Sequence, residues 1–397
     1  MAIRSPVLVL LMAAVLGSTA PFAWGQESAA SKISFHKVQI DPVFRAEGVA
    51  VADFNGDGQN DIAAGSVYYA GPDWKMHSIL PEPKAFEPKT YSDAFCCFAE
   101  DVNRNGRPDL IVVDIPGKPT CWFENPGAEG KAWPRHMAMP VTNNESPIWV
   151  DVTGDNRPEL VCGYSPEHDK PDSPKRRMAF AGPGSDPLAP WPIRTFSAEN
   201  TPGSRKYAHG LGAGDVNGDG RADVVIIEGW WEGPAKADQP EWTFHEANFG
   251  EHAAHMHVYD FDGDGDADVL SSSAHRFGIW WHEQRLDGWK THTIDQSISQ
   301  THAVCLADLN GDGLPDFVTG KRWWAHMGHD PGSDQPAVVV WYELAQKHGI
   351  PVWTRHAIDD NSGVGTQFEV TDVNGDGLLD VVTSNKKGVY YFQQERK

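Results

Sequence analysis

One nine-residue phrase recurs seven times along this 397-residue chain and constrains its fold more than any other feature. The phrase typically has Asp first, Asn or Asp third, an acid or amide fifth, Gly sixth and an acid ninth. The copies begin at Asp53, Asp101, Asp151, Asp215, Asp260, Asp308 and Asp372, at intervals of 45 to 64 residues. A repeat of this length predicts an architecture built from one recurring supersecondary unit.

The phrase is also a candidate calcium loop, because oxygen side chains at alternate positions of a tight Gly turn can converge on a hard cation. It is not an EF-hand, since position twelve is Ala64 in the first copy and β-rich runs flank the loops. The copies from Asp101 and Asp151 are weaker candidates because Asn105, Thr153 and Glu159 depart from the pattern. We therefore expect structural Ca²⁺ at five loops, with the ligands Asp53, Asn55, Asp57, Asp61, Asp215, Asn217, Asp219, Asp223, Asp260, Asp262, Asp264, Asp268, Asp308, Asn310, Asp312, Asp316, Asp372, Asn374, Asp376 and Asp380.

Each unit contains the pattern of four strands. A short apolar run precedes each loop, a β-branched run such as 224–227 follows it, and an aromatic run such as 278–282 comes next. The unit then ends in a Trp-x-x-His-like segment, as in Trp289 to His292. Four strands in about 45 to 50 residues are typical of a propeller blade.

The seventh unit stops after its aromatic run and lacks the last strand, whereas residues 33–41 form an unpartnered strand of that type. The sequence therefore predicts an all-β fold, a seven-bladed β-propeller of four-stranded blades with calcium loops, whose last blade the N-terminal strand closes. Such closure removes the open sheet edge that would invite aggregation.

In-phase loops of this kind resemble the FG-GAP or VCBS repeat family, whose propeller is also found in integrin α-chains, and the resemblance covers residues 33 to 397. The family implies the fold and leaves the function open, because the fold hosts adhesins, lectins, scaffolds and some enzymes.

The first residues have the features of an export signal. Arg4 precedes an apolar run from Val7 to Leu16 and a small-x-small site ends at Gly25. We expect a signal peptide at 1–25, a linker at 26–32, the propeller at 33–397, and export to a periplasm or beyond. An uncleaved membrane anchor is the alternative, although the run is short for a bilayer.

The net charge of −22 argues against nucleic acid or an anionic membrane as a partner. The five cysteines form no regular disulfide framework. The best pair is Cys96 or Cys97 with Cys121, and the alternative is five buried apolar thiols.

Candidate ligands for a second metal lie six residues before the loops, at the end of each blade opposite to them. Glu47, Glu145, His209 and His302 occupy this place in four units, and His255 or His257 lies close to it in the fifth, with His252 further out. Imidazoles with a carboxylate predict a channel site for Zn²⁺ or another divalent transition metal. A polar channel without metal is the alternative.

A second ring of polar residues follows the second strands of several units. Lys321, Arg322 and Arg276 are candidates to polarise a carbonyl, and Glu228 or Tyr207 to move a proton. A solvated rim is the alternative for each of them.

Two functions fit these patterns. The Trp-x-x-His strands and His-bearing inner strands are similar to the propeller domain of aldos-2-ulose dehydratase, which implies a metal-dependent lyase acting on a keto-sugar or related carbohydrate. That family's cupin domains have no counterpart here. The alternative is a non-catalytic lectin- or adhesion-like propeller that binds carbohydrate or protein.

Overall fold

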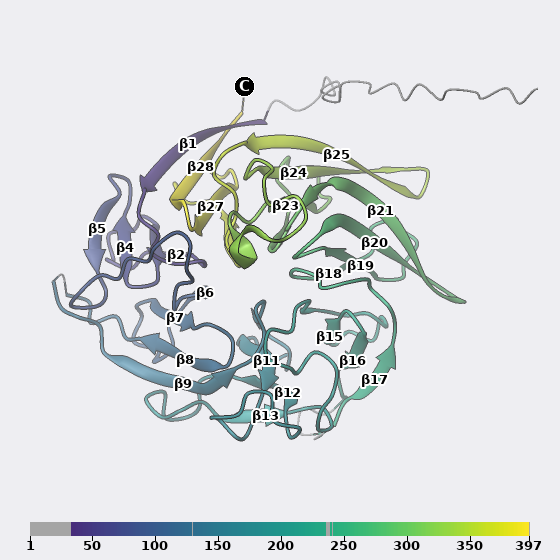
Figure 1. Ribbon diagram of the computed structural model, residues 1–397, viewed down its shortest axis with the longest axis horizontal. Coiled ribbons are helices and arrows are strands. Elements are labelled where there is room, and N and C mark those ends of the chain that lie inside the picture. Colours follow the sequence, from purple (N-terminus) through teal and green to yellow (C-terminus); the bar gives the residue numbers. More distant parts are fainter. Residues whose placement is uncertain (1–32, 129, 236–238, 240, 397) are drawn as a thin grey trace, which may run out of the picture. The chain divides into compact units, whose positions relative to one another are not determined.

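The computed structural model describes residues 33–128, 130–235, 239 and 241–396. In this part of the chain the strands form seven antiparallel four-stranded sheets, arranged as blades around a common centre (Figure 1). The seven-bladed β-propeller predicted from the repeats is therefore confirmed. The proposed signal peptide and linker lie outside the described residues.

The first four blades follow the sequence from inner to outer strand. Blade one contains β2 (Ala50–Ala52), β3 (Asp61–Ala64), β4 (Val67–Ala70) and β5 (Lys75–Ser78). Blade two contains β6 (Cys96–Glu100), β7 (Asp109–Val113), β8 (Lys118–Phe123) and β9 (Arg135–Thr142). Blade three contains β10 (Ile148–Val150), β11 (Glu159–Tyr164), β12 (Arg177–Ala181) and β13 (Ile193–Thr195). Blade four contains β14 (Gly212–Gly214), β15 (Asp223–Ile226), β16 (Gly229–Glu232) and β17 (Thr243–Glu246).

Blades five and six have longer outer hairpins. Blade five contains β18 (His257–Tyr259), β19 (Asp268–Ser272), β20 (Phe277–Arg285) and β21 (Gly288–Ser299). Blade six contains β22 (Val304–Ala307), β23 (Asp316–Gly320), β24 (Val339–Lys347) and β25 (Ile350–Asp359), with the short 3₁₀ helix η1 (Ala325–Gly328) between its second and third strands. Blade seven contains β26 (Phe368–Thr371), β27 (Asp380–Asn385) and β28 (Gly388–Arg396), and its outer strand is β1 (Ile33–Asp41), which pairs antiparallel with β28.

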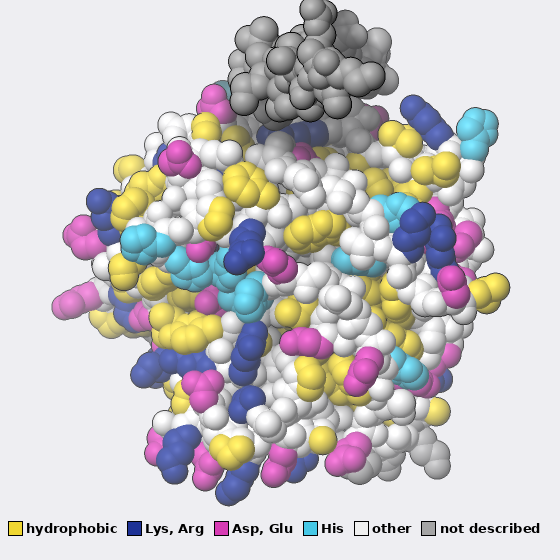
Figure 2. Space-filling view, turned by 45° about the vertical axis from the view of Figure 1, so that its right-hand side comes forward, with side chains coloured by type: hydrophobic (Ala, Val, Ile, Leu, Met, Phe, Trp, Pro, Cys, Tyr) yellow, Lys and Arg dark blue, Asp and Glu magenta, His cyan; other side chains and the backbone are white. Residues whose placement is uncertain are grey.

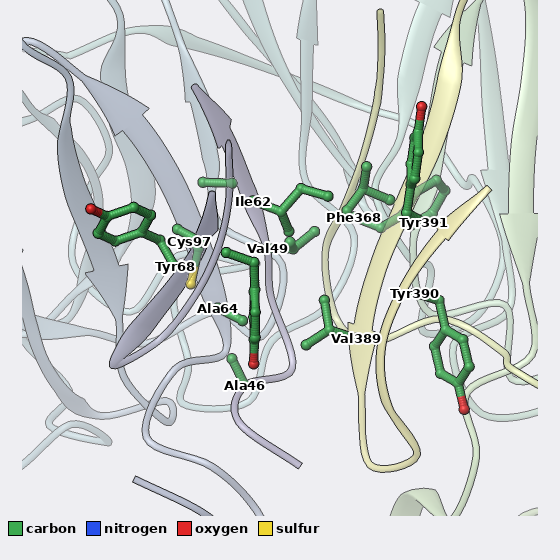
Figure 3. Packing of buried hydrophobic residues seen from close by; sticks show 14 of the residues in the cluster. Ala46, Val49, Ile62, Ala64, Tyr68, Cys97, Phe368, Val389, Tyr390 and Tyr391 are labelled. Atoms are coloured by element: carbon green, nitrogen blue, oxygen red, sulfur yellow. The ribbon is translucent and has the colours of Figure 1, made fainter. Parts of the chain in front are cut away.

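Apolar side chains fill the space between neighbouring blades, as Figure 3 shows for blades one and seven. Val49 and Ile62 belong to the same buried cluster as Phe368 and Val389. Gly365 lets the two blades approach closely here, because a Cβ atom at this position would lie 1.9 Å from the carbonyl oxygen of Glu47. The first and last blades therefore pack as tightly as a protein core requires.

Antiparallel pairing gives every blade two distinct ends. In blade seven Thr371 pairs with Asp380 beside the nine-residue loop, and Phe368 pairs with Thr383 at the other end. The starts of inner strands and the ends of second strands therefore meet at the end without the loops. We call it the mouth end.

The nine-residue loops are held by their own carboxylates. Asp53 Oδ1 accepts hydrogen bonds from the amides of Gly56 (2.7 Å) and Asp57 (3.1 Å). Asp61, the ninth residue, accepts from Gly71 and so ties the loop to the end of β4. In the loops from Asp151 and Asp260 three carboxylate oxygens lie within 4.8 Å of one another. Calcium binding stays a prediction.

The degenerate third loop keeps its turn, because Asn156 adopts the left-handed conformation (φ 63°) and donates its amide to Asp151. All five cysteines are free thiols, four of them buried. Val112 of β7 pairs with Cys97 on one side and Cys121 on the other, so that two strand spacings separate these sulfurs. Among the described residues, no helix is long and apolar enough to cross a membrane.

Candidate functional site

Three buried side chains from three blades meet at the mouth end. His302 Nε2 lies 3.1 Å from Glu145 Oε2, and His209 Nε2 lies 3.4 Å from the same oxygen. The three ligand-type atoms lie within 4.8 Å of one another. Blades three, four and six each supply one of them, from the segment just before the inner strand.

These segments meet because backbone hydrogen bonds join neighbouring blades at the mouth end. The amide of Glu145 donates to Ala208 O (3.0 Å), and that of Thr366 donates to Glu47 O (2.9 Å). Residues at the same place in each repeat therefore face one small space, although 157 positions separate Glu145 from His302.

A third imidazole extends the group. His275 follows β19, and its Nε2 lies 3.0 Å from Nε2 of His209. Its Nδ1 lies 3.4 Å from Oδ2 of Asp330, which His326 Nδ1 contacts at 3.0 Å. We call Glu145, His209, His275 and His302 the mouth cluster. On the face shown in Figure 2, several histidine side chains gather in one patch at the left beside acidic and basic ones, and other histidines lie singly.

Buried positive charge flanks the mouth cluster. Arg322 forms a close ion pair with Glu47, and its Nη1 lies 3.6 Å from Glu145 Oε2. Lys386 Nζ lies 3.6 Å from Glu47 Oε1 and 3.8 Å from the centre of the Tyr91 ring. Two carboxylates and two cations thus balance one another out of contact with bulk water.

The protonation states suit metal binding. Burial opposes ionisation of Glu145, but His209 and His302 outweigh it and hold the pKa of this carboxyl well below its usual range. Burial and the charge of Arg322 keep the pKa of His302 well below that of a free imidazole. Burial, with His209 and His326 nearby, lowers the pKa of His275 to about 4. A carboxylate and neutral imidazoles are the forms that coordinate metals.

His255 and His257 do not join the mouth cluster, contrary to the sequence-based expectation. His257 Nε2 donates to the carbonyl of Val304 (2.9 Å), and a backbone hydrogen bond with Pro147 engages His255. Glu47 also differs from expectation, because it pairs with Arg322 rather than with the imidazoles.

Of the five predicted catalytic residues, Arg322 adjoins the mouth cluster. Lys321 instead donates to Ser333 O (3.3 Å), and Arg276 pairs with Glu251 (3.5 Å) in an exposed position. Glu228 Oε2 is buried and has no hydrogen-bond partner among the described residues, and burial raises the pKa of this carboxyl. The Tyr207 ring is 44% exposed, but its backbone carbonyl contacts His209 Nδ1 at 2.9 Å.

Several residues at the site were not among the predicted ligands or catalytic groups. His275 and Lys386 follow second strands and so belong to the second ring of polar residues, in which the sequence singled out other members. Asp330 lies in the extra residues of the sixth repeat, and its long spacing was the signal for that segment. Tyr91 lies between β5 and β6, outside both rings.

Two stretches of the chain, residues 101–162 and 260–319, match the family model of the FG-GAP-like repeat. The chain carries FG-GAP-like repeats. Both matched stretches begin at the first Asp of a nine-residue loop. Each ends within the second strand of the following blade, β11 or β23. No curated protein matches the sequence significantly.

Similar solved structures share little sequence with this FG-GAP-repeat propeller. BBS1N in complex with ARL6DN has 10% identity and a TM-score of 0.54, over 92% of this chain and 98% of that chain. A lectin from Agrocybe aegerita that recognises non-reducing terminal N-acetylglucosamine has 14% identity and a TM-score of 0.46, over 91% and 86%. The exotype rhamnogalacturonan lyase YesX has 12% identity and a TM-score of 0.43, over 91% and 76%. At such identities the likeness concerns the fold alone.

Proposed function

We propose that this propeller is a metal-dependent carbon–oxygen lyase, which removes water or a similar group from a keto-sugar or related carbohydrate. The observation that carries the proposal is the buried convergence of His209, His302 and Glu145 at the mouth end. Clusters of titratable groups with shifted pKa values are more frequent at functional sites than elsewhere.

The donor set fits Zn²⁺ or another divalent transition metal. A carbonyl oxygen only accepts hydrogen bonds, so His209 Nδ1 carries the proton in its contact with Tyr207 O. In the neutral ring this tautomer leaves the Nε2 lone pair on the side of Glu145 and His302. Two imidazoles and one carboxylate leave a coordination position for a substrate oxygen, and a metal bound there would supply Lewis acidity that polarises a carbonyl.

The reaction needs one proton removed and one returned. A base takes the proton from the carbon beside the carbonyl, and the electron pair of that C–H bond forms the new C=C bond. The β-hydroxyl leaves with the electrons of its C–O bond and receives a proton to become water.

We assign proton transfer to Lys386. Burial lowers the pKa of its ammonium group to about 8, although Glu47 opposes the change. Such a group exchanges protons readily near neutral pH. Arg322, whose pKa Glu47 and Glu145 raise against the effect of burial, stays positive and can stabilise negative charge that develops on the substrate oxygen.

The test combines elemental analysis with an activity assay. We expect one transition metal per chain beyond calcium, and conversion of an aldos-2-ulose such as D-glucosone to an unsaturated ketone, followed by ultraviolet absorbance. The variants His209→Ala and His302→Ala should lose both the bound transition metal and the activity. The exposed His36 of β1 provides a matched control, His36→Ala, which should lose neither. Absence of a transition metal, or turnover that survives both mouth variants, would overturn the proposal.

A binding function without catalysis is the second candidate. Trp323 and Trp324 follow Arg322 and are half-buried. Trp324 O lies 3.4 Å from Lys386 Nζ, and Lys89 Nζ lies 4.7 Å from the Trp324 ring centre. Aromatic rings with neighbouring cations suit a carbohydrate or a protein ligand. Glycan binding that persists in His209→Ala and His302→Ala would favour this candidate.

We further propose that Ca²⁺ occupies the five stronger loops and stabilises the blades, because clustered carboxylates repel one another unless a cation joins them. The apolar N-terminal segment supports export to a periplasm or beyond as the setting of the reaction.

A further inference from the structure

We propose that His275 is an additional ligand of the mouth-end metal and that Asp330 is the residue that positions it. This inference rests on the metal centre of the proposed function. It adds that the loop between β23 and β24, which is the insertion of blade six, controls how tightly the metal is held.

The first argument concerns the protons on two facing imidazoles. His209 donates its Nδ1 proton to Tyr207 O, so the neutral ring has its lone pair on Nε2. His275 Nε2 lies 3.0 Å from that atom. A proton on either Nε2 makes this contact a hydrogen bond. With a proton on neither, two lone pairs face each other, and a cation between them removes the repulsion.

The second argument concerns the other side of the His275 ring. Nδ1 is buried and makes no hydrogen bond within the described part of the chain, yet it lies 3.4 Å from the carboxylate oxygen Oδ2 of Asp330. A carboxylate at this place favours the tautomer with its proton on Nδ1, because the N–H group can then donate to it. That tautomer leaves Nε2 free to bind a metal together with His209. With His275 as a fourth protein ligand, a substrate oxygen would take a fifth coordination position, which zinc sites can add during a reaction.

Two neighbouring side chains fix the Asp330 carboxylate that would position His275. Its Oδ2 accepts a hydrogen bond from Gln300 Nε2 (3.1 Å), and His326 Nδ1 lies 3.0 Å from the same oxygen. The Asp330 side chain is 14% exposed. Metal-bound histidines commonly donate their second N–H to such a carboxylate, which fixes the ring and raises the basicity of the ligand.

The insertion presents Asp330 through a constrained backbone. Trp324, His326 and Met327 all have left-handed φ values, 57°, 46° and 58°. Tyr91 Oη accepts the amide of His326 (3.1 Å), and Ser333 Oγ donates to Gly328 O (2.7 Å), so contacts on both sides hold the turn. Non-glycine residues persist in this conformation where their surroundings fix it.

The test uses Co²⁺ as the probe, with the full chain purified free of metal and kept in excess Ca²⁺ so that the loops do not take up cobalt. Visible absorption reports the ligands of Co²⁺, and competition with a chelator gives its affinity. We expect one Co²⁺ per chain. Asp330→Asn should weaken binding by about 10- to 100-fold, and His275→Ala should also change the spectrum.

The insertion offers a matched control. Asp334 is exposed on the same segment, so Asp334→Asn changes the charge equally and should leave affinity and spectrum unchanged. Circular dichroism and melting of the metal-free variants separate a positioning role from loss of the fold. If Asp330→Asn misfolds, His275→Ala alone decides through the spectrum.

The outcomes separate this inference from the proposed function. If the unmodified protein binds no Co²⁺, both are overturned. If it binds Co²⁺ and neither Asp330→Asn nor His275→Ala alters affinity or spectrum, this inference alone is overturned. Two Co²⁺ ions per chain would also overturn it, because His275, His326 and Asp330 would then form a separate site.

Discussion

The buried charges beside the mouth cluster lead to a quantitative prediction for Arg322→Met. The guanidinium is 2% exposed, pairs with Glu47, which is 1% exposed, and lies 3.6 Å from Glu145. The substitution removes one of the two positive charges that neutralise the buried carboxylates of Glu47 and Glu145. Lys386 still lies 3.6 Å from Glu47. Removing one partner of a buried ion pair costs about 3–5 kcal/mol of folding free energy.

This cost converts to a shift of the melting temperature. For about 360 folded residues at about 2.1 cal/mol/K each, the entropy of unfolding is about 0.76 kcal/mol/K. A loss of about 4 kcal/mol therefore lowers the melting temperature by about 5 °C. Differential scanning calorimetry of the wild type and the variant measures it.

Two further variants test the reasoning. Arg276→Met makes the same substitution in an ion pair whose side chains are 65% and 56% exposed, and should cost at most about 1 kcal/mol. Arg322→Met combined with Glu47→Gln should recover part of the loss, because the buried charge is then removed along with its partner. Equal melting temperatures of Arg322→Met and Arg276→Met would refute the account.

Three other predictions concern the ring and its loops. Chelation with EDTA should lower the melting temperature markedly, and added Ca²⁺ should restore it; an unchanged melt would contradict calcium binding. Burial raises the pKa of Glu369 to about 7, so the folded state retains a proton that the unfolded chain has lost, and stability falls as pH rises from about 4 through 7. Glu369→Gln should therefore melt above the wild type at pH 8, by a margin that shrinks towards pH 5, and a margin that grows would disprove the sign. Gly365→Ala should destabilise the junction of blades one and seven, because its Cβ would lie 1.9 Å from Glu47 O and 2.3 Å from Ser384 O; wild-type melting would show that the junction can relax.

The blades were predictable because their determinants are local. Each loop carries the Gly or Asn that its turn requires, and short apolar, β-branched runs flank it. The Trp-x-x-His segment also has a local structural role: in blade six, His356 stacks on Trp341 at a centroid distance of 4.4 Å and contacts Glu343 at 2.8 Å. Because neighbouring strands of a blade are also close in the sequence, a motif that recurs in each unit indicates such contacts.

The mouth cluster was predictable only in part. Glu145, His209 and His302 hold the same position in their repeats, so the ring brings them together. Blade five has Ala254 at this position, and its nearby histidines bind backbone carbonyls instead. The third imidazole, His275, belongs to the ring of polar residues that follows the second strands, and the sequence does not tell which members of that ring face the cluster.

The sequence by itself determined the number of blades, their four strands and the end of the ring at which polar side chains gather, because turn chemistry and runs of β-forming residues act over a few residues. Only the tertiary structure decided that His275 faces His209, that Arg322 pairs with Glu47, and that Asp330 from the blade-six insertion reaches the cluster. These contacts join residues 66, 275 and 55 positions apart. Their geometry depends on how closely the blades pack around the centre, and no local pattern of residues encodes that distance.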